Sequence, residues 1–117
     1  MRFKGNPLTT NTLYRTVCRG KYISVYLTDD GKARKYQYQM EAKMQWKKPV
    51  LEGDLTVTVD LYFKDKRRRD WDNFNKIVMD SLEGICFKDD SQIQEAVVRK
   101  HIDKEIPRIE IEIYENL

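Results

Sequence analysis

Residues 55–63 read Leu-Thr-Val-Thr-Val-Asp-Leu-Tyr-Phe, an almost perfect alternation of apolar and polar side chains. Successive side chains of a β-strand point to opposite faces of its sheet, so the apolar set from Leu55 to Phe63 falls on one face and the polar set on the other. The pattern predicts a half-buried strand, and it is the clearest secondary-structure signal in the chain.

Amphipathic helices are predicted on both sides of this strand. Residues 32–48 contain no glycine or proline before the proline that follows them, and Tyr36, Met40 and Met44 recur at helical spacing. Such a stripe is typical of a core-facing or dimer-forming surface. Residues 71–84 also carry apolar side chains at helical spacing, and they end at a glycine, which commonly terminates helices.

The remaining strands are predicted from shorter patterns. Residues 1–14 read as a brief strand that enters a polar loop, and residues 21–27, 92–102 and 108–115 are rich in β-branched or alternating residues. The order β–β–α–β–α–β–β favours an α+β two-layer sandwich, with one mixed, mostly antiparallel sheet and two helices on one of its faces. We expect residues 1–117 to form one domain.

Composition excludes several classes of protein. Of the 117 residues, 40% are hydrophobic and 11% aromatic, which is too many for a disordered tail. No apolar run approaches the ~18–20 residues of a membrane helix, and no signal-peptide pattern opens the chain. The two cysteines, Cys18 and Cys86, cannot form a disulfide framework. We therefore expect a cytoplasmic protein with two reduced thiols.

Charge is segregated along the chain although the net charge is only +3. Residues 1–49 hold 11 Lys or Arg against 3 Asp or Glu, and residues 64–69 hold five bases against one acid. Residues 70–91 hold six acids against two bases. Basic residues attract phosphates and clustered carboxylates attract divalent cations, so this pattern fits a site that handles a polyanion, although it also fits an ordinary solvated surface.

The residues that could carry chemistry lie in two short stretches, Arg67-Arg68-Arg69-Asp70-Trp71-Asp72-Asn73-Phe74-Asn75-Lys76 and Phe87-Lys88-Asp89-Asp90-Ser91-Gln92. The first lies where a strand exit meets the start of a helix, and the chain reversal after Gly84 can return the second to the same edge of the sheet. We therefore expect three or four carboxylates to converge beside a basic run.

Crowded carboxylates repel one another unless a cation lies between them. Mg²⁺ prefers oxygen ligands and is often shared between one or two carboxylates and a substrate phosphate. A zinc site is not indicated, because the chain has one histidine and no cysteine pair at ligand spacing. A carboxylate-bound Mg²⁺ beside a basic run suits phosphodiester hydrolysis, because the metal polarises a phosphoryl oxygen and lowers the pKa of water.

Each of these signals also has a purely structural interpretation. Lys76 lies four residues after Asp72, which predicts either a cation beside a scissile phosphate or an ordinary surface ion pair within a helix. Asp70 or Asp72 could cap a helix, and Asp89-Asp90 could form a turn. The basic run from Arg67 to Arg69 could be a solvated loop. A single site would explain all of these signals together.

At these residues the chain resembles the RusA family of Holliday-junction resolvases, small endodeoxyribonucleases of bacteria and their prophages. The matching motif consists of Arg67-Arg68-Arg69-Asp70-Trp71-Asp72-Asn73, Lys76, Asp80-x-Leu82 and Asp89-Asp90-Ser91-Gln92. The segment Gly5-Asn6-Pro7-Leu8-Thr9-Thr10-Asn11 is similar to the N-terminal loop of the family. Trp71 stands where the family often has an aliphatic residue, which we interpret as a substitution in the core.

The resemblance implies a role for each matching residue. Asp70, Asp72 and Asp90 would be catalytic carboxylates that bind one or two Mg²⁺ per subunit, with Asp89 as a further candidate ligand. Lys76 would be the catalytic lysine. Lys66, Arg67, Arg68 and Arg69, together with Lys76, would contact DNA.

The resemblance also implies a homodimer that acts on branched DNA, the four-way junction, without an organic cofactor or a membrane. Symmetry supports the dimer independently, because a four-way junction is twofold symmetric and its resolution needs two symmetric cuts. Two alternatives stay open: a non-catalytic nucleic-acid-binding module, and a phage-type interaction or inhibitor domain.

Overall fold

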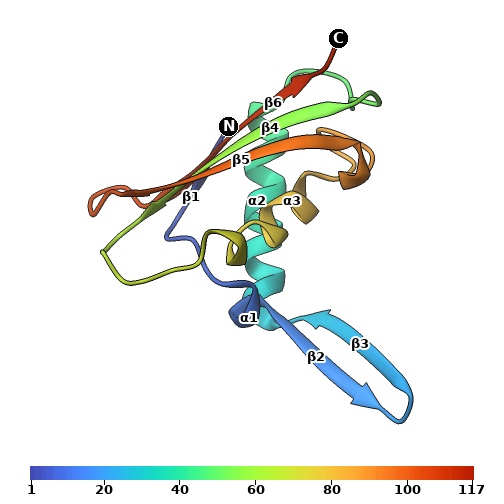
Figure 1. Ribbon diagram of the computed structural model, residues 1–117, viewed down its shortest axis with the longest axis vertical. Helices are drawn as coiled ribbons and strands as arrows, with labels where there is room; N and C mark the ends of the chain where they lie inside the picture. The colour runs from blue at the N-terminus through green and yellow to red at the C-terminus, as the bar shows by residue number, and fades with distance from the viewer.

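A computed structural model describes all residues, 1–117 (Figure 1). The elements along the chain are β1 (Arg2–Lys4), α1 (Thr10–Leu13), β2 (Tyr14–Arg19), β3 (Tyr22–Leu27), α2 (Asp29–Gln45), β4 (Leu55–Phe63), the 3-10 turn η1 (Trp71–Asn73), α3 (Lys76–Leu82), the 3-10 turn η2 (Asp90–Gln92), β5 (Ile93–Ile102) and β6 (Arg108–Glu115). None of the helices has the length and apolar character needed to cross a membrane.

Four strands form one twisted sheet in the order β1-β6-β4-β5. Strand β4 pairs antiparallel with β6 and parallel with β5, so the sheet is mixed and mostly antiparallel, as predicted. Every apolar residue of the alternating stretch from Leu55 to Phe63 is buried, and Ile109, Ile111 and Ile113 of β6 share its face. Helices α2 and α3 both cover this face (Figure 1), which confirms the α+β two-layer arrangement.

Helix α2 contacts the sheet through a different stripe from the predicted one. Tyr38 and Ala42 are fully buried, and the Tyr38 ring packs edge-on against the Phe3 ring with centroids 5.3 Å apart. Tyr36 and Met44 are 67% and 73% exposed, so the core interpretation of their stripe is wrong, and the dimer-face interpretation stays a prediction. The helix also begins and ends three residues earlier than predicted.

A close approach of two chain segments fixes the start of α2. The side-chain oxygen of Thr28 accepts a hydrogen bond from the backbone N–H of Gly31 and so caps the helix. A Cβ added at Gly31 would lie 2.2 Å from the carbonyl oxygen of Leu13. The end of α1 can therefore cross α2 here only because residue 31 has no side chain.

The predicted strand at residues 21–27 does not join the main sheet. It forms β3 and pairs antiparallel with β2 in a separate two-stranded hairpin that extends away from the body of the molecule (Figure 1). Both β2 and the short helix α1 were absent from the predicted order. The prediction of one sheet containing every strand is therefore wrong for this hairpin.

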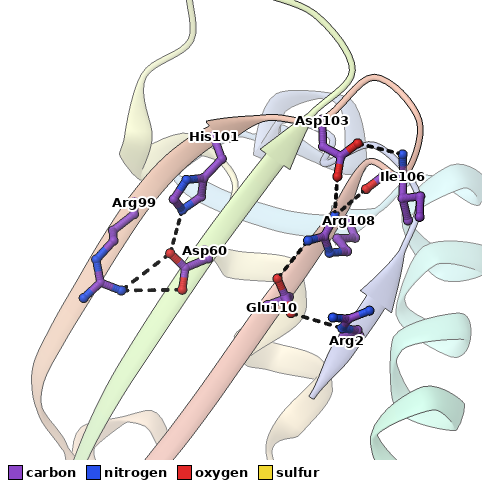
Figure 2. Close-up of polar contacts among 8 residues, drawn as sticks. All are labelled: Arg2, Asp60, Arg99, His101, Asp103, Ile106, Arg108 and Glu110. Atoms are coloured by element: carbon purple, nitrogen blue, oxygen red, sulfur yellow. Dashed lines mark hydrogen bonds and ion pairs between the residues drawn. The ribbon is translucent and has the colours of Figure 1, made fainter.

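The face of the main sheet that the helices leave uncovered is polar and carries ladders of paired charges (Figure 2). His101 and Arg99 of β5 both contact Asp60 of β4, with His101 Nε2 2.7 Å from a carboxylate oxygen. Arg108 binds Asp103 at 2.8 Å and Glu110 at 3.1 Å, and Arg2 binds Glu110 at 3.1 Å. The cations of this face are thus largely neutralised by carboxylates on the same sheet.

Candidate active site

Three carboxylates gather where α3 ends and β5 begins. Glu83, Asp89 and Asp90 each offer an oxygen, and these oxygens all lie within 4.8 Å of one another. No other set of three or more acidic, histidine or cysteine side chains comes this close together. The acidic cluster is therefore the one place in the chain where several ligand oxygens already surround a common point.

Local backbone structure builds the acidic cluster. Helix α3 ends at Leu82, and Gly84 takes a left-handed conformation with φ +84°, which reverses the chain. The backbone N–H of Gly84 then donates to the carbonyl of Phe87 at 2.7 Å. Gln92 fixes the other side: its Oε1 accepts from the backbone N–H groups of Lys88 and Asp89, each at 2.9 Å.

The electrostatics of the acidic cluster favour a cation. Partial burial raises the pKa of Glu83, and the nearby negative charges of Asp90, Asp80 and Asp89 raise it further. The pKa of Asp89 is lowered, because its carboxylate accepts hydrogen bonds from the hydroxyl and backbone N–H of Ser91. The set offers only carboxylate oxygens and is short of positive charge, which fits a hard divalent cation such as Mg²⁺.

Asp70 and Asp72 lie in the loop that leads from β4 to α3, and they do not join the acidic cluster. The single chain therefore does not form the expected group of Asp70, Asp72 and Asp90. Asp70 occupies the cap position of η1 but its side chain makes no capping hydrogen bond. Both carboxylates are exposed, and neither takes part in an ion pair. The helix-cap interpretation of Asp70 is therefore confirmed for its position but not for its side chain.

Lys76 is the first residue of α3, and its ion-pair partner is not Asp72, as the spacing had suggested. Asp72 lies in η1 and Lys76 begins α3, so the two residues do not share a helical face as expected. The ammonium of Lys76 instead lies 3.2 Å from Asp80 Oδ2, one turn further along α3. It also lies 5.0 Å from the centre of the Tyr14 ring, and the Tyr14 hydroxyl donates to Asp80 at 2.5 Å.

The basic loop, residues 64–69, borders a cavity of about 400 Å³ with the end of β5. Its lining includes the four predicted cations of the loop and Lys100, with no carboxylate: Phe63, Lys66, Arg67, Arg68, Arg69, Lys100, His101 and Ile102. The Lys100 ammonium donates to the carbonyl of Arg69 at 2.7 Å, which ties β5 to the loop.

The arginines of the basic loop differ in the exposure and the contacts of their side chains. The Arg69 side chain is 12% exposed, and its guanidinium lies 2.7 Å from Asp65 and stacks over the Phe63 ring at 4.4 Å from its centre. Arg67 is 80% exposed, and Arg68 is exposed and makes no ion pair. Arg69 therefore anchors the loop. Arg68 presents its charge to solvent, and Arg67 is largely exposed although its Nε lies 3.5 Å from Asp65.

Sequence reasoning missed Glu83 and Lys100, and it misplaced Trp71. Glu83 was missed because it is a single acidic residue at the end of a predicted helix and belongs to no recognisable motif. Lys100 was one charge in a weakly patterned strand. Trp71 is 58% exposed, so the interpretation of this residue as part of the core is wrong; its helical partners Phe74, Ile77, Val78 and Leu82 are buried as expected.

Comparison with known proteins identifies the family. The family model described as Endodeoxyribonuclease RusA matches residues 5–114. A search of curated proteins finds no significant match. The matched region covers the loop after β1, the basic loop, the exposed carboxylates, Lys76 and the acidic cluster. The chain belongs to the RusA family of endodeoxyribonucleases, which resolve Holliday junctions.

Proposed function

We propose that this chain is a Mg²⁺-dependent, structure-selective endodeoxyribonuclease that acts in the cytoplasm as a homodimer. It resolves Holliday junctions in DNA recombination and repair by symmetric phosphodiester hydrolysis. The observation that carries this proposal is the succession, within one family-matched region, of a basic loop, two unpaired carboxylates, a lysine and an acidic cluster.

The basic loop and the carboxylates have different proposed roles. Arg67 and Arg68 bind backbone phosphates, and Arg69 keeps the loop that carries them in place. Asp70, Asp72 and Asp90 are the catalytic carboxylates, and Asp89 and Glu83 complete the oxygen donors beside Asp90. When bound there, Mg²⁺ neutralises the carboxylates and polarises the phosphoryl group. We propose one or two ions per subunit, one of them in the acidic cluster.

Lys76 supplies a positive charge that the transition state needs. Hydrolysis of a phosphodiester builds negative charge on the phosphoryl oxygens, and a fixed ammonium stabilises that charge without reorganisation. Asp80 and the Tyr14 ring hold the ammonium at the start of α3. Asp80 and Tyr14 are positioning residues, because they act on the reaction only through Lys76.

A homodimer follows from the symmetry of the substrate. Two strands of the junction must be cut symmetrically, and a twofold dimer presents two identical sites related by the same rotation. Contacts with phosphates carry no sequence information. We therefore expect the selectivity for branched DNA to come from the spacing of the two sites and the shape of the junction.

Asp70→Asn distinguishes this proposal from a non-catalytic DNA-binding module. A labelled four-way junction and a linear duplex are incubated with the wild type and with the variant, with and without Mg²⁺. We expect Mg²⁺-dependent, paired cuts in the junction alone by the wild type. The variant should lose cleavage while binding the junction as tightly or more tightly, because one carboxylate no longer repels the phosphate. A wild type that binds the junction but never cuts it would favour the binding module.

A wild type that binds no DNA at low salt would favour the protein-interaction alternative. Sedimentation of the free protein tests the homodimer separately, since a monomer at micromolar concentration would contradict it.

A further inference from the structure

The β2–β3 hairpin has two chemically different faces. Residues that pair directly across an antiparallel ribbon lie on the same face. Arg15 pairs with Tyr26 and Arg19 pairs with Tyr22, so both arginines and both tyrosines lie on one face, which we call the Arg/Tyr face. The opposite face carries Thr16, Cys18, Ile23 and Val25 beyond its base and has no charged residue.

The turn of the hairpin adds a third cation at its tip. Gly20 and Lys21 connect the two strands, and Gly20 has φ +61°, a conformation that suits the first position of a tight hairpin turn. Lys21 is exposed. The cations of the hairpin are thus spread along its whole length, from Arg15 near the body to Lys21 at the end.

These three cations have no partner within the protein. Arg15, Arg19 and Lys21 are exposed, and none of them forms an ion pair or a side-chain hydrogen bond. Residues 14–28 contain no Asp or Glu. On the open face of the main sheet, by contrast, Arg2, Arg99 and Arg108 all contact carboxylates. The hairpin therefore keeps a local charge of +3 with no ion pair, although Asp29 and Asp30 share with Arg15 the hollow at its base.

The hairpin also exposes aromatic surface that the fold does not use. Tyr22 is 79% exposed and Tyr26 is 49% exposed. A two-stranded hairpin on its own is marginally stable in water, and this one has no sheet or helix packed along its outer part (Figure 1). Arginines interleaved with tyrosines are side chains that bind nucleic-acid backbones and stack on bases or sugars.

We propose that the Arg/Tyr face of the hairpin is a DNA-binding arm that contacts the phosphate backbone of a duplex arm of the junction. The charge of the hairpin is complementary to DNA, and a two-stranded ribbon fits the major groove, which is about 12 Å wide. The arm reaches away from the acidic cluster and the basic loop (Figure 1), so it extends the contact beyond the site of cleavage. This inference rests on the proposed function.

Arg15→Gln/Arg19→Gln tests the arm, with Lys47→Gln/Lys104→Gln as the matched control. Each double variant removes two exposed, unpaired cations from a chain of net charge +3, and the control pair lies outside the hairpin. Binding of a labelled four-way junction is measured without divalent metal at several salt concentrations. Released counterions make the logarithm of the binding constant fall with log salt by about 0.9 for each phosphate contact.

We expect the hairpin variant to bind at least about ten-fold more weakly at low salt and to have a slope about 1.8 smaller than that of the wild type. The control should keep the slope of the wild type. Arg15→Lys/Arg19→Lys retains the charges and should restore the slope. Lys21→Gln at the tip should reduce the slope by about 0.9, which keeps the test decisive if the double variant fails to fold.

Equal salt slopes for the hairpin variant and the control would overturn the proposal that the hairpin binds DNA. So would a hairpin variant that changes only the sedimentation coefficient of the free protein, because the hairpin would then contact a second copy or another protein. If the wild type cuts the junction but the hairpin variant has the same salt slope of binding as the wild type, the DNA-binding arm is contradicted and the proposed function is not. A wild type that binds but never cuts, with the slope reduced in the variant, contradicts the proposed function alone.

Discussion

The ammonium of Lys76 lies 3.2 Å from the carboxylate of Asp80, one turn further along α3. This ion pair, together with the Tyr14 ring beneath it, restricts a side chain that would otherwise be flexible. A fixed ammonium is more useful in catalysis than a mobile one, because little reorganisation is needed when charge develops.

Lys76→Met should therefore reduce the cleavage rate far more than it reduces binding. We expect the single-turnover rate on a saturating four-way junction to fall by about 100-fold or more, with a small change in the dissociation constant. Asp80→Asn should give a smaller decrease, because the ammonium remains but loses its anchor. Lys47→Met is the control, since it removes one exposed lysine elsewhere. A Lys76→Met protein that cuts at the rate of the control would remove Lys76 from the mechanism.

Glu83→Gln should show whether the acidic cluster binds Mg²⁺. Without metal, the substitution removes both the repulsion within the cluster and the cost of partial burial of a charge, so we expect Tm to rise by a few degrees. With millimolar Mg²⁺, the wild type should gain stability and the variant should gain less. Glu95→Gln, at an exposed strand position, is the matched control. Identical Mg²⁺-induced shifts in all three proteins would place the ion elsewhere.

The sequence was informative wherever a residue pattern had only one way to bury its apolar side chains. Strands β4 and β6 were predicted within a residue because an alternating strand has only one apolar face. Helix α2 was harder, because its residues Tyr36, Tyr38, Met40, Ala42 and Met44 give two apolar stripes. Packing chose Tyr38 and Ala42: the ring of Tyr38 meets Phe3, and its hydroxyl accepts a hydrogen bond from Arg34 at 3.1 Å.

The site was predicted in its motifs but not in its geometry. The break between η1 and α3 separates Asp72 from Lys76, and no spacing rule could reveal it, because residues 71–82 keep helical periodicity through the break. Strand β2 was not predicted because neither of its sides is consistently apolar, and none of its residues is buried. The Gly20-Lys21 turn was the available signal, since two-residue hairpins favour glycine at the first position.

Arg68→Gln and Arg69→Gln should separate a phosphate contact from a structural anchor. Arg68 is exposed and unpaired, so its loss should lower the salt slope of junction binding by about 0.9 and leave Tm unchanged. Arg69 stacks on Phe63 and binds Asp65, so its loss should lower Tm and loosen the basic loop. Thermal melting and salt titrations on both proteins give the comparison. If Arg69→Gln has the Tm of the wild type while Arg68→Gln has a lower Tm, the two assignments are reversed.

Asp103→Asn should change the acid sensitivity of the fold. Asp103 closes the turn between β5 and β6 by accepting hydrogen bonds from the backbone N–H of Ile106 and from Arg108 (Figure 2), and from the backbone N–H of Glu105. These bonds lower the pKa of its carboxyl.

A carboxyl whose pKa is lower in the folded state stabilises that state above its ordinary pKa of about 4, and this contribution is lost as the pH falls through the folded value. Asp103→Asn should therefore melt a few degrees below the wild type near pH 7. The gap should narrow as the pH falls below this ordinary value, because the lost contribution of the wild-type carboxylate then grows as the carboxyl takes up its proton. Melting curves across this range, with Glu95→Gln as the control, test the assignment, and a gap of constant size from pH 7 to pH 3 would contradict it.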